Sequence, residues 1–177
     1  MIYLKNSEQI KKMQRAGRIT GEALLLAGEA VREGISTASL DKIIRNHIEK
    51  SGAKPSFLGY AGFPGSACIS INDEGIHGIP SKKRILQEGD IVSLDAGLIY
   101  KGYHSDAART HGVGQISPEA EKLIRVTKES FFEGIKLIKE GVHLNEVSKA
   151  IQEYAKAYNV TVVPSLNVIG HTGDFLA

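Results

Sequence analysis

Apolar residues recur at helical spacing in the first third of the chain. Between residues 7 and 32 they stand three or four positions apart, at Ile10, Met13, Ala16, Ile19 and Ala23. This pattern predicts an amphipathic helix over residues 7–32, with Ser7 as its cap. The same spacing predicts a second helix over residues 39–50, with Gly52 as the residue that follows its C-terminal end.

The pattern changes after the second predicted helix. Residues 57–114 carry short apolar runs interrupted by glycines, which predict strands joined in hairpins. Helical spacing then returns over residues 117–139, where Ser117 is a candidate cap and Pro118 the first helical residue. A fourth helix is predicted over residues 145–157. Helices that flank a block of hairpin strands predict an α+β fold.

The chain contains an internal repeat. A shift of about 107 residues places the first predicted helix pair on the second, so that Arg18, Thr20, Glu22, Glu33 and Gly34 fall on Arg125, Thr127, Glu129, Glu140 and Gly141. The alternative is that any two amphipathic helix pairs share some identities. A true repeat predicts a first copy over about residues 7–114 and an incomplete second copy over about 117–177, within one truncated domain spanning 1–177. Sheet surface left uncovered by the missing strands favours self-association.

Asp95 and Asp106 give the strongest local signal of chemistry. Lys101 and Gly102 predict a two-residue turn between two β runs, which sets Gly97 opposite Asp106. Asp95 lies two residues before Gly97, on the same face of its strand. The aspartates are then diagonal neighbours with Cα atoms about 7–8 Å apart.

Two facing carboxylates repel each other and need a compensating charge, which a pair of divalent cations supplies. The alternative is two solvated aspartates near a turn, and spacing alone leaves both explanations open. Gly97 favours the metal, because we expect it to leave open space beside the Asp106 carboxylate.

Two further segments carry candidate site residues. His77 lies among turn residues at a strand end, where a catalytic group can act on a scissile carbonyl or a leaving group. A surface histidine in a turn is the alternative. Phe57, Tyr60 and Phe63 alternate with glycines before Cys68, which is typical of an apolar pocket or of plain sheet packing.

The composition of the chain limits the partners and the cellular compartment that we expect for it. The formal charge is +2 and both signs are interspersed, so neither nucleic acid nor a membrane surface is expected as a partner. The chain starts without an apolar signal segment, and its one cysteine, Cys68, allows no internal disulfide. These features predict a cytoplasmic protein.

Taken together, these segments resemble the type I methionine aminopeptidases, metallopeptidases of family M24 with the pseudo-twofold pita-bread fold. The resemblance runs from about Ile10 to Val163 and rests on residues 59–64, 68–72, 77–80, 89–92 and 95–106. It implies two divalent metal ions (Mn, Fe, Co or Zn), with Asp95 and Asp106 among their ligands. It also implies that His77 contacts the substrate as a catalytic residue. The implied methionine pocket consists of Phe57, Tyr60, Phe63 and Cys68.

The resemblance fails after Val163. The family needs one more histidine and two glutamates as metal ligands, and no matching glutamates follow here. His171 is the candidate third ligand if two residues are inserted before it, a shift that keeps its side chain on the same strand face. A direct register places Ile169 there instead, and the residues from Pro164 onward are then not family sequence. Asp174 is a poor replacement for a glutamate.

The resemblance implies hydrolysis of the first peptide bond of peptides that begin with methionine, including nascent chains at the ribosome. Because ligands are missing, we expect weakened metal binding and impaired or absent turnover. The alternative is a catalytically dead module that binds peptides, or the product of a decaying gene.

Overall fold

The computed structural model of the protein describes residues 3–162. The chain divides into two compact units, the first ending at Ile116 and the second starting at Ser117. Within residues 3–162, no helix is long and apolar enough to cross a bilayer. The units are described in turn.

Two helices open the first unit. α1 spans Ser7–Glu29 and α2 spans Thr37–Lys50. The cap of α1 is Asn6 and not Ser7 as predicted, because the Asn6 side chain accepts the Gln9 N–H while the Gln9 side chain accepts the Asn6 N–H. α1 also ends before residue 32, because the chain turns toward Gly34, whose φ is +81°. Ala30 and Val31 still pack against the core and so continue the apolar pattern beyond the helix.

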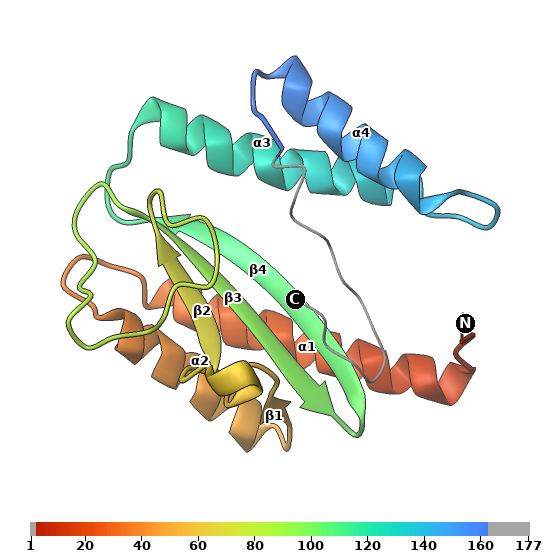
Figure 1. The fold of residues 1–177 in the computed structure, drawn as a ribbon, viewed down its shortest axis with the longest axis horizontal. Coiled ribbons are helices and arrows are strands. Elements are labelled where there is room, and N and C mark those ends of the chain that lie inside the picture. The colour runs from red at the N-terminus through yellow and green to blue at the C-terminus, as the bar shows by residue number, and fades with distance from the viewer. Residues whose placement is uncertain (1–2, 163–177) are drawn as a thin grey trace. The chain divides into compact units, whose positions relative to one another are not determined.

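A four-stranded antiparallel sheet follows the helices (Figure 1). Its strands are β1 (Lys54–Pro55), β2 (Ala67–Ile71), β3 (Ile91–Tyr100) and β4 (Tyr103–Gly112). β3 pairs with β4 along one edge and with β1 and β2 along the other. The predicted hairpin register is confirmed: Tyr100 opposes Tyr103, and Gly97 opposes Asp106. β1 lies before the region in which strands were predicted.

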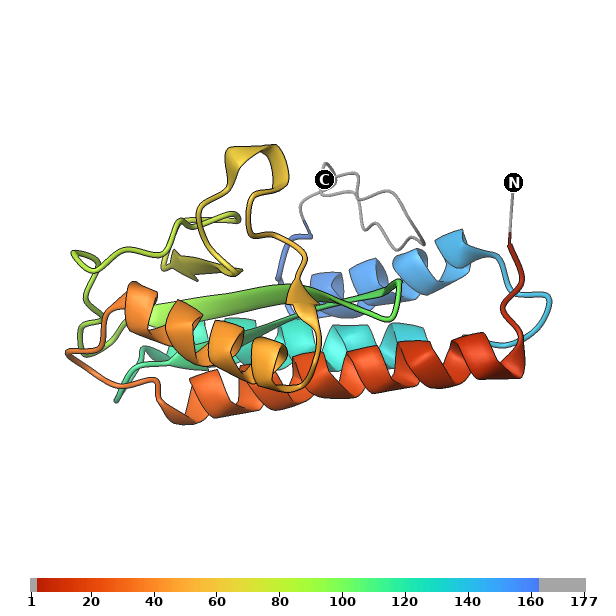
Figure 2. The same ribbon diagram turned by 90° about the horizontal axis from the view of Figure 1, so that it is seen from below.

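The core of the first unit lies between the sheet and the two helices, which cover one sheet face (Figure 2). Alternate residues of β3 have no exposed surface and point to this core, namely Val92, Leu94, Ala96 and Leu98. The helices contribute Ile19, Leu40 and Ile44, which are equally buried. The intervening residues of β3, Asp95 among them, therefore face away from the helices.

The second unit contains α3 (Pro118–Ile135) and α4 (Leu144–Ala157). The predicted start of α3 is confirmed, because the Ser117 side chain accepts the Ala120 N–H and Pro118 is the first helical residue. α3 ends at Ile135, before the predicted residue 139. Both ends of α4 lie 107 residues after the corresponding ends of α2.

The same offset relates details of the two helix pairs. Gly34 and Gly141 precede the second helix of each pair, with φ of +81° and +82°. In the first pair, Glu22 Oε2 lies 3.1 Å from His47 Nε2. In the second, Tyr154 Oη donates to Glu129 Oε2 at 3.0 Å. One polar contact thus joins the helices at equivalent positions of both pairs, which supports the proposed repeat.

Candidate active site

Asp95 and Asp106 share the sheet face that points away from the helices. Gly97 opposes Asp106 across the hairpin, and Asp95 lies two residues before Gly97 on β3. On the other side of β3, Cys68 of β2 is the direct partner of Asp95. One face of three adjacent strands therefore presents a thiol and two carboxyl groups.

The two carboxyl groups perturb each other. Burial raises the pKa of Asp95 to about 7, and the charge of Asp106 and a hydrogen bond between the two side chains act in the same direction. Burial also raises the pKa of Asp106, while the hydrogen bonds from Asp95 and from the Ala107 backbone oppose that change. Burial and the close approach of the two carboxyl groups therefore disfavour the state in which both are ionised. Asp106 is the more exposed residue, so the stronger perturbation belongs to Asp95.

A divalent cation fits this pair in charge and in ligand type. Carboxylate oxygens are hard ligands that such ions prefer, and a bound cation would offset the repulsion between the two carboxylates. Within residues 3–162, no cluster of three or more histidine, cysteine, aspartate or glutamate side chains is arranged to hold a metal ion. His171, the predicted third ligand, lies outside the described residues.

The space beside Gly97 is filled, contrary to the prediction. A Cβ added at Gly97 would lie 2.7 Å from Cε1 of Phe57, whose residue is 8% exposed. The missing side chain lets the aromatic ring pack on the strand backbone. Phe57 therefore brings an apolar surface next to the carboxylate pair.

Cys68 is a buried, neutral thiol at this site. Burial raises the pKa of the thiol to about 12, and the charges of Asp95 and Asp106 add to this effect. A thiol that stays protonated at neutral pH is neither a nucleophile nor a thiolate ligand. Its contribution to the site is therefore a small apolar surface.

Tyr60 and Phe63 lie in a tight turn between β1 and β2. Gly59, Ala61 and Gly62 all have left-handed backbone conformations there. Tyr60 is 43% exposed, while Phe63 is half-buried. Phe57 is thus the most buried of the three predicted aromatic residues, and its ring lies against Gly97 on the strand that carries Asp95.

Asp41 of α2 anchors the end of this turn, a role that the sequence did not indicate. Its Oδ1 accepts the backbone N–H groups of Ser66 and Ala67 at 2.7 and 2.9 Å. These contacts fix the chain at Ser66 and Ala67, where β2 starts, directly before Cys68. An aspartate inside a helix gives no sign in the sequence that it binds a distant loop.

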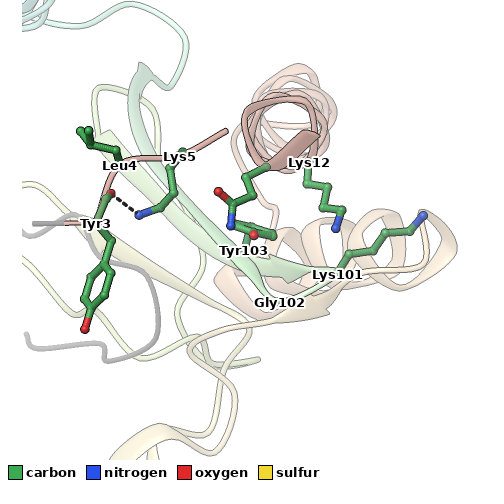
Figure 3. A pocket seen from close by; sticks show the side chains of 8 residues that line it. Tyr3, Leu4, Lys5, Lys12, Lys101, Gly102 and Tyr103 are labelled. Atoms are coloured by element: carbon green, nitrogen blue, oxygen red, sulfur yellow. Dashed lines mark hydrogen bonds between the residues drawn. The ribbon is translucent and has the colours of Figure 1, made fainter. Parts of the chain in front are cut away.

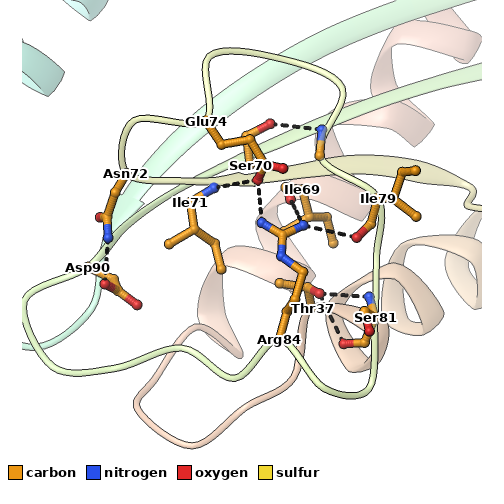
Figure 4. Close-up of polar contacts among 11 residues, drawn as sticks. Thr37, Ile69, Ser70, Ile71, Asn72, Glu74, Ile79, Ser81, Arg84 and Asp90 are labelled. Atoms are coloured by element: carbon orange, nitrogen blue, oxygen red, sulfur yellow. Dashed lines mark hydrogen bonds and ion pairs between the residues drawn. The ribbon is translucent and has the colours of Figure 1, made fainter.

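The exposed His77 belongs to the loop that runs from Glu74 to Ile79. Figure 4 shows this loop beside β2. The loop is tied to the strand through Gly78, whose N–H donates to Ser70 Oγ at 3.1 Å and whose carbonyl accepts the Ile69 N–H at 2.8 Å. Ser70 lies two residues after Cys68 and shares its sheet face. The strand that pairs with Asp95 therefore also holds the loop that carries His77.

A cavity of about 530 Å³ lies elsewhere on the first unit, between the start of α1 and the β3–β4 turn (Figure 3). Its lining includes Lys5, Lys12 and Lys101, and none of the predicted site residues. It is therefore separate from the carboxylate pair.

Comparisons with known proteins agree on one family. The family model described as metallopeptidase family M24 matches residues 11–173. The methionine aminopeptidases of Clostridium acetobutylicum and Clostridium perfringens are 50% and 52% identical over 171 residues, which are 97% of this chain and 68% of each relative. The crystal structure of methionine aminopeptidase from Rickettsia prowazekii superposes with a TM-score of 0.89 at 36% identity, over 93% of this chain and 66% of that one. The chain thus spans about two thirds of the length of these relatives.

Proposed function

The chain belongs to metallopeptidase family M24, among the methionine aminopeptidases, and on this premise we propose that the sheet face with Asp95 and Asp106 is part of a site that removes N-terminal methionine. Members of this family are hydrolytic enzymes. The observation that carries the proposal is the placement of the two carboxyl groups on the same face of one hairpin, Asp106 opposite Gly97 and Asp95 two residues before it. A bound cation would offset the repulsion between two carboxylates held this close together.

Asp95 and Asp106 would hold the divalent ions, and His171 is the proposed third ligand. We propose two ions, drawn from manganese, iron, cobalt and zinc. Such ions, when bound, polarise the scissile carbonyl and lower the pKa of water. The protein contributes two fixed carboxylates, whose spacing is set by the hairpin register rather than by flexible loops.

The methionine side chain of the substrate would lie against Phe57 and Cys68, with Tyr60 and Phe63 at the rim. Phe57 and Cys68 are buried beside the carboxylates, so an apolar side chain placed there brings its own amino terminus to the acidic pair. A thioether suits this surface, because sulfur packs favourably on aromatic rings. The positive amino terminus is attracted by the negative charge of the two aspartates.

His77 would contact the peptide at its first bond. Its residue is exposed, so the imidazole can reach a ligand that lies on the same sheet face. A donor at this position stabilises negative charge that develops on the carbonyl oxygen, or donates a proton to the leaving amine.

A peptide-binding module without turnover is the second candidate function. In favour of this candidate, residues 3–162 contain no cluster of three or more candidate metal ligands, while Phe57 and Cys68 of the proposed pocket are buried. Such a module would keep affinity for methionine peptides and lose hydrolysis. In either case we propose cytoplasmic peptides that begin with methionine, including nascent chains at the ribosome, as ligands. Self-association through uncovered sheet surface is a further proposal.

One assay separates these functions. The purified chain is incubated with the peptide Met-Gly-Met and added Mn²⁺, Co²⁺ or Fe²⁺, and released methionine is measured alongside peptide binding by calorimetry. Metal-dependent release supports the aminopeptidase, and binding without release supports the module. A chain that neither binds nor cleaves the peptide contradicts both.

A further inference from the structure

Arg84 connects strand β2 to two positions of the loop that carries His77 (Figure 4). Its Nη1 donates to the carbonyl oxygens of Ile69 and Ile79, at 3.2 and 2.9 Å. Its Nη2 forms an ion pair with Glu74 Oε2. One guanidinium thus joins strand β2 to loop positions on both sides of His77.

His77 needs such support because its own backbone is strained. Its φ is +60°, a left-handed conformation that residues other than glycine seldom adopt. Conformations of this kind persist only where the surrounding structure holds them. Glu74 and Ile79, the two loop residues that Arg84 binds, lie three residues before His77 and two after it.

Glu74 extends the same network to the strand. Its Oε2 also accepts the Ile71 N–H at 3.2 Å. The Arg84 side chain is 29% exposed, so water only partly screens these contacts. A guanidinium can serve two carbonyls and a carboxylate at once because its donors form a rigid fork, which a lysine ammonium lacks.

We propose that Arg84 is a positioning residue, whose guanidinium holds the loop so that the His77 imidazole meets the bound peptide. The contact between His77 and the peptide is part of the proposed function and depends on it. The positioning of the loop by Arg84 does not depend on that function, because it is inferred from the hydrogen bonds and the ion pair of Arg84.

The test compares Arg84→Gln and Arg84→Lys with Arg45→Gln, which removes another arginine–glutamate pair, the one with Glu49 on α2. Hydrogen exchange of the Gly78 amide measures the order of the loop. Calorimetry with Met-Gly-Met measures peptide affinity, both in the natural chain and in the His77→Ala background.

We expect Gly78 exchange to rise by about tenfold or more in Arg84→Gln, to rise less in Arg84→Lys, and to stay unchanged in Arg45→Gln. Peptide affinity should fall by about tenfold in Arg84→Gln and by less than about twofold when His77 is already alanine, since the two residues act as one unit. Circular dichroism confirms that each variant folds.

Two results would overturn the proposal, one from hydrogen exchange and one from peptide affinity. Unchanged protection of Gly78 in Arg84→Gln shows that the guanidinium does not hold the loop. An equal loss of peptide affinity with and without His77 shows that Arg84 acts by another route. A natural chain that binds no peptide overturns the proposed function, and with it the role of His77, while the exchange measurement still decides the holding of the loop.

Discussion

The aromatic ring of Phe57 packs on the backbone of Gly97, on the strand that carries Asp95. A Cβ at Gly97 would come within 2.7 Å of Phe57 Cε1 and 3.2 Å of Ser56 Oγ. The glycine is thus required by a close approach and not by its backbone angles. The contact between Phe57 and Gly97 therefore positions the aromatic ring that forms one side of the proposed methionine pocket.

Gly97→Ala is expected to displace the Phe57 ring. The added methyl group overpacks the contact and should lower the free energy of unfolding by about 1–3 kcal/mol, together with the affinity for Met-Gly-Met. Gly21→Ala is the matched control, because a Cβ at that helical position meets nothing within 4 Å. Urea unfolding and calorimetry measure both effects. Equal behaviour of the two variants would show that the ring adapts without loss.

Asp95→Asn should weaken the binding of Mn²⁺ to the chain. The amide removes one carboxylate and half of the negative charge, so we expect a loss of affinity of about tenfold or more. Titration calorimetry measures it, with Glu33→Gln as the control on an exposed turn. If Asp95→Asn binds Mn²⁺ as tightly as the natural chain, the carboxylate pair is not a metal site.

The metal-free chain should lose stability as the pH rises. The pKa of Asp95 is about 7 in the folded chain, against an ordinary value of 3.8 for an aspartate exposed to water. The folded chain therefore retains a proton that the unfolded chain releases between about pH 4 and pH 7, and the free energy of unfolding falls across this window by at most about 4 kcal/mol. Urea unfolding with a chelator at several pH values follows the change.

Asp95→Asn supplies the reference for this pH dependence. Because the amide does not titrate, the variant should gain stability relative to the natural chain as the pH rises from about 4 to about 7. A difference between the two chains that stays constant over this range would mean that Asp95 titrates normally. Saturating Mn²⁺ should reverse the trend, since the cation favours the ionised pair.

Gly78→Ala should detach the loop that carries His77. An added Cβ would overlap the carbonyl oxygen of Ile69, a backbone atom that cannot swing aside. We expect a loss of about 1–3 kcal/mol in the free energy of unfolding and a loss of peptide affinity. Gly75→Ala is the control within the same loop, because a Cβ there meets nothing within 4 Å. Retained affinity in Gly78→Ala would place His77 outside the peptide site.

Much of the local structure followed from the sequence. The turn at Lys101 and Gly102 fixed the partners along the β3–β4 hairpin, because a two-residue turn allows one register. The cap at Ser117 was predicted because proline follows it. The cap of α1 was misplaced by one residue, since Asn6 and Ser7 are both good caps and only the reciprocal bond with Gln9 distinguishes them.

What the sequence did not predict depends on contacts between distant segments. Phe57 and Gly97 lie 40 residues apart, and neither residue alone indicates that a ring fills the space of the missing side chain. Arg84 and Asp41 bind mainly backbone groups, which every residue carries. Tertiary packing therefore decides which backbone groups Arg84 and Asp41 bind, and the sequence contains no residue pattern that identifies these groups.

The β3–β4 hairpin has a consequence for the order of folding. Asp95 and Asp106 are eleven positions apart and meet through a turn of two residues, so their contact is local and its loop closes fast. Isolated hairpins form in about 1–10 μs, well before strands distant along a chain find each other. We therefore expect the two carboxyl groups to meet while β2 and its loop are still unattached. Their mutual repulsion should then slow folding, and a proton or a cation taken up at this stage should accelerate the collapse of the first unit.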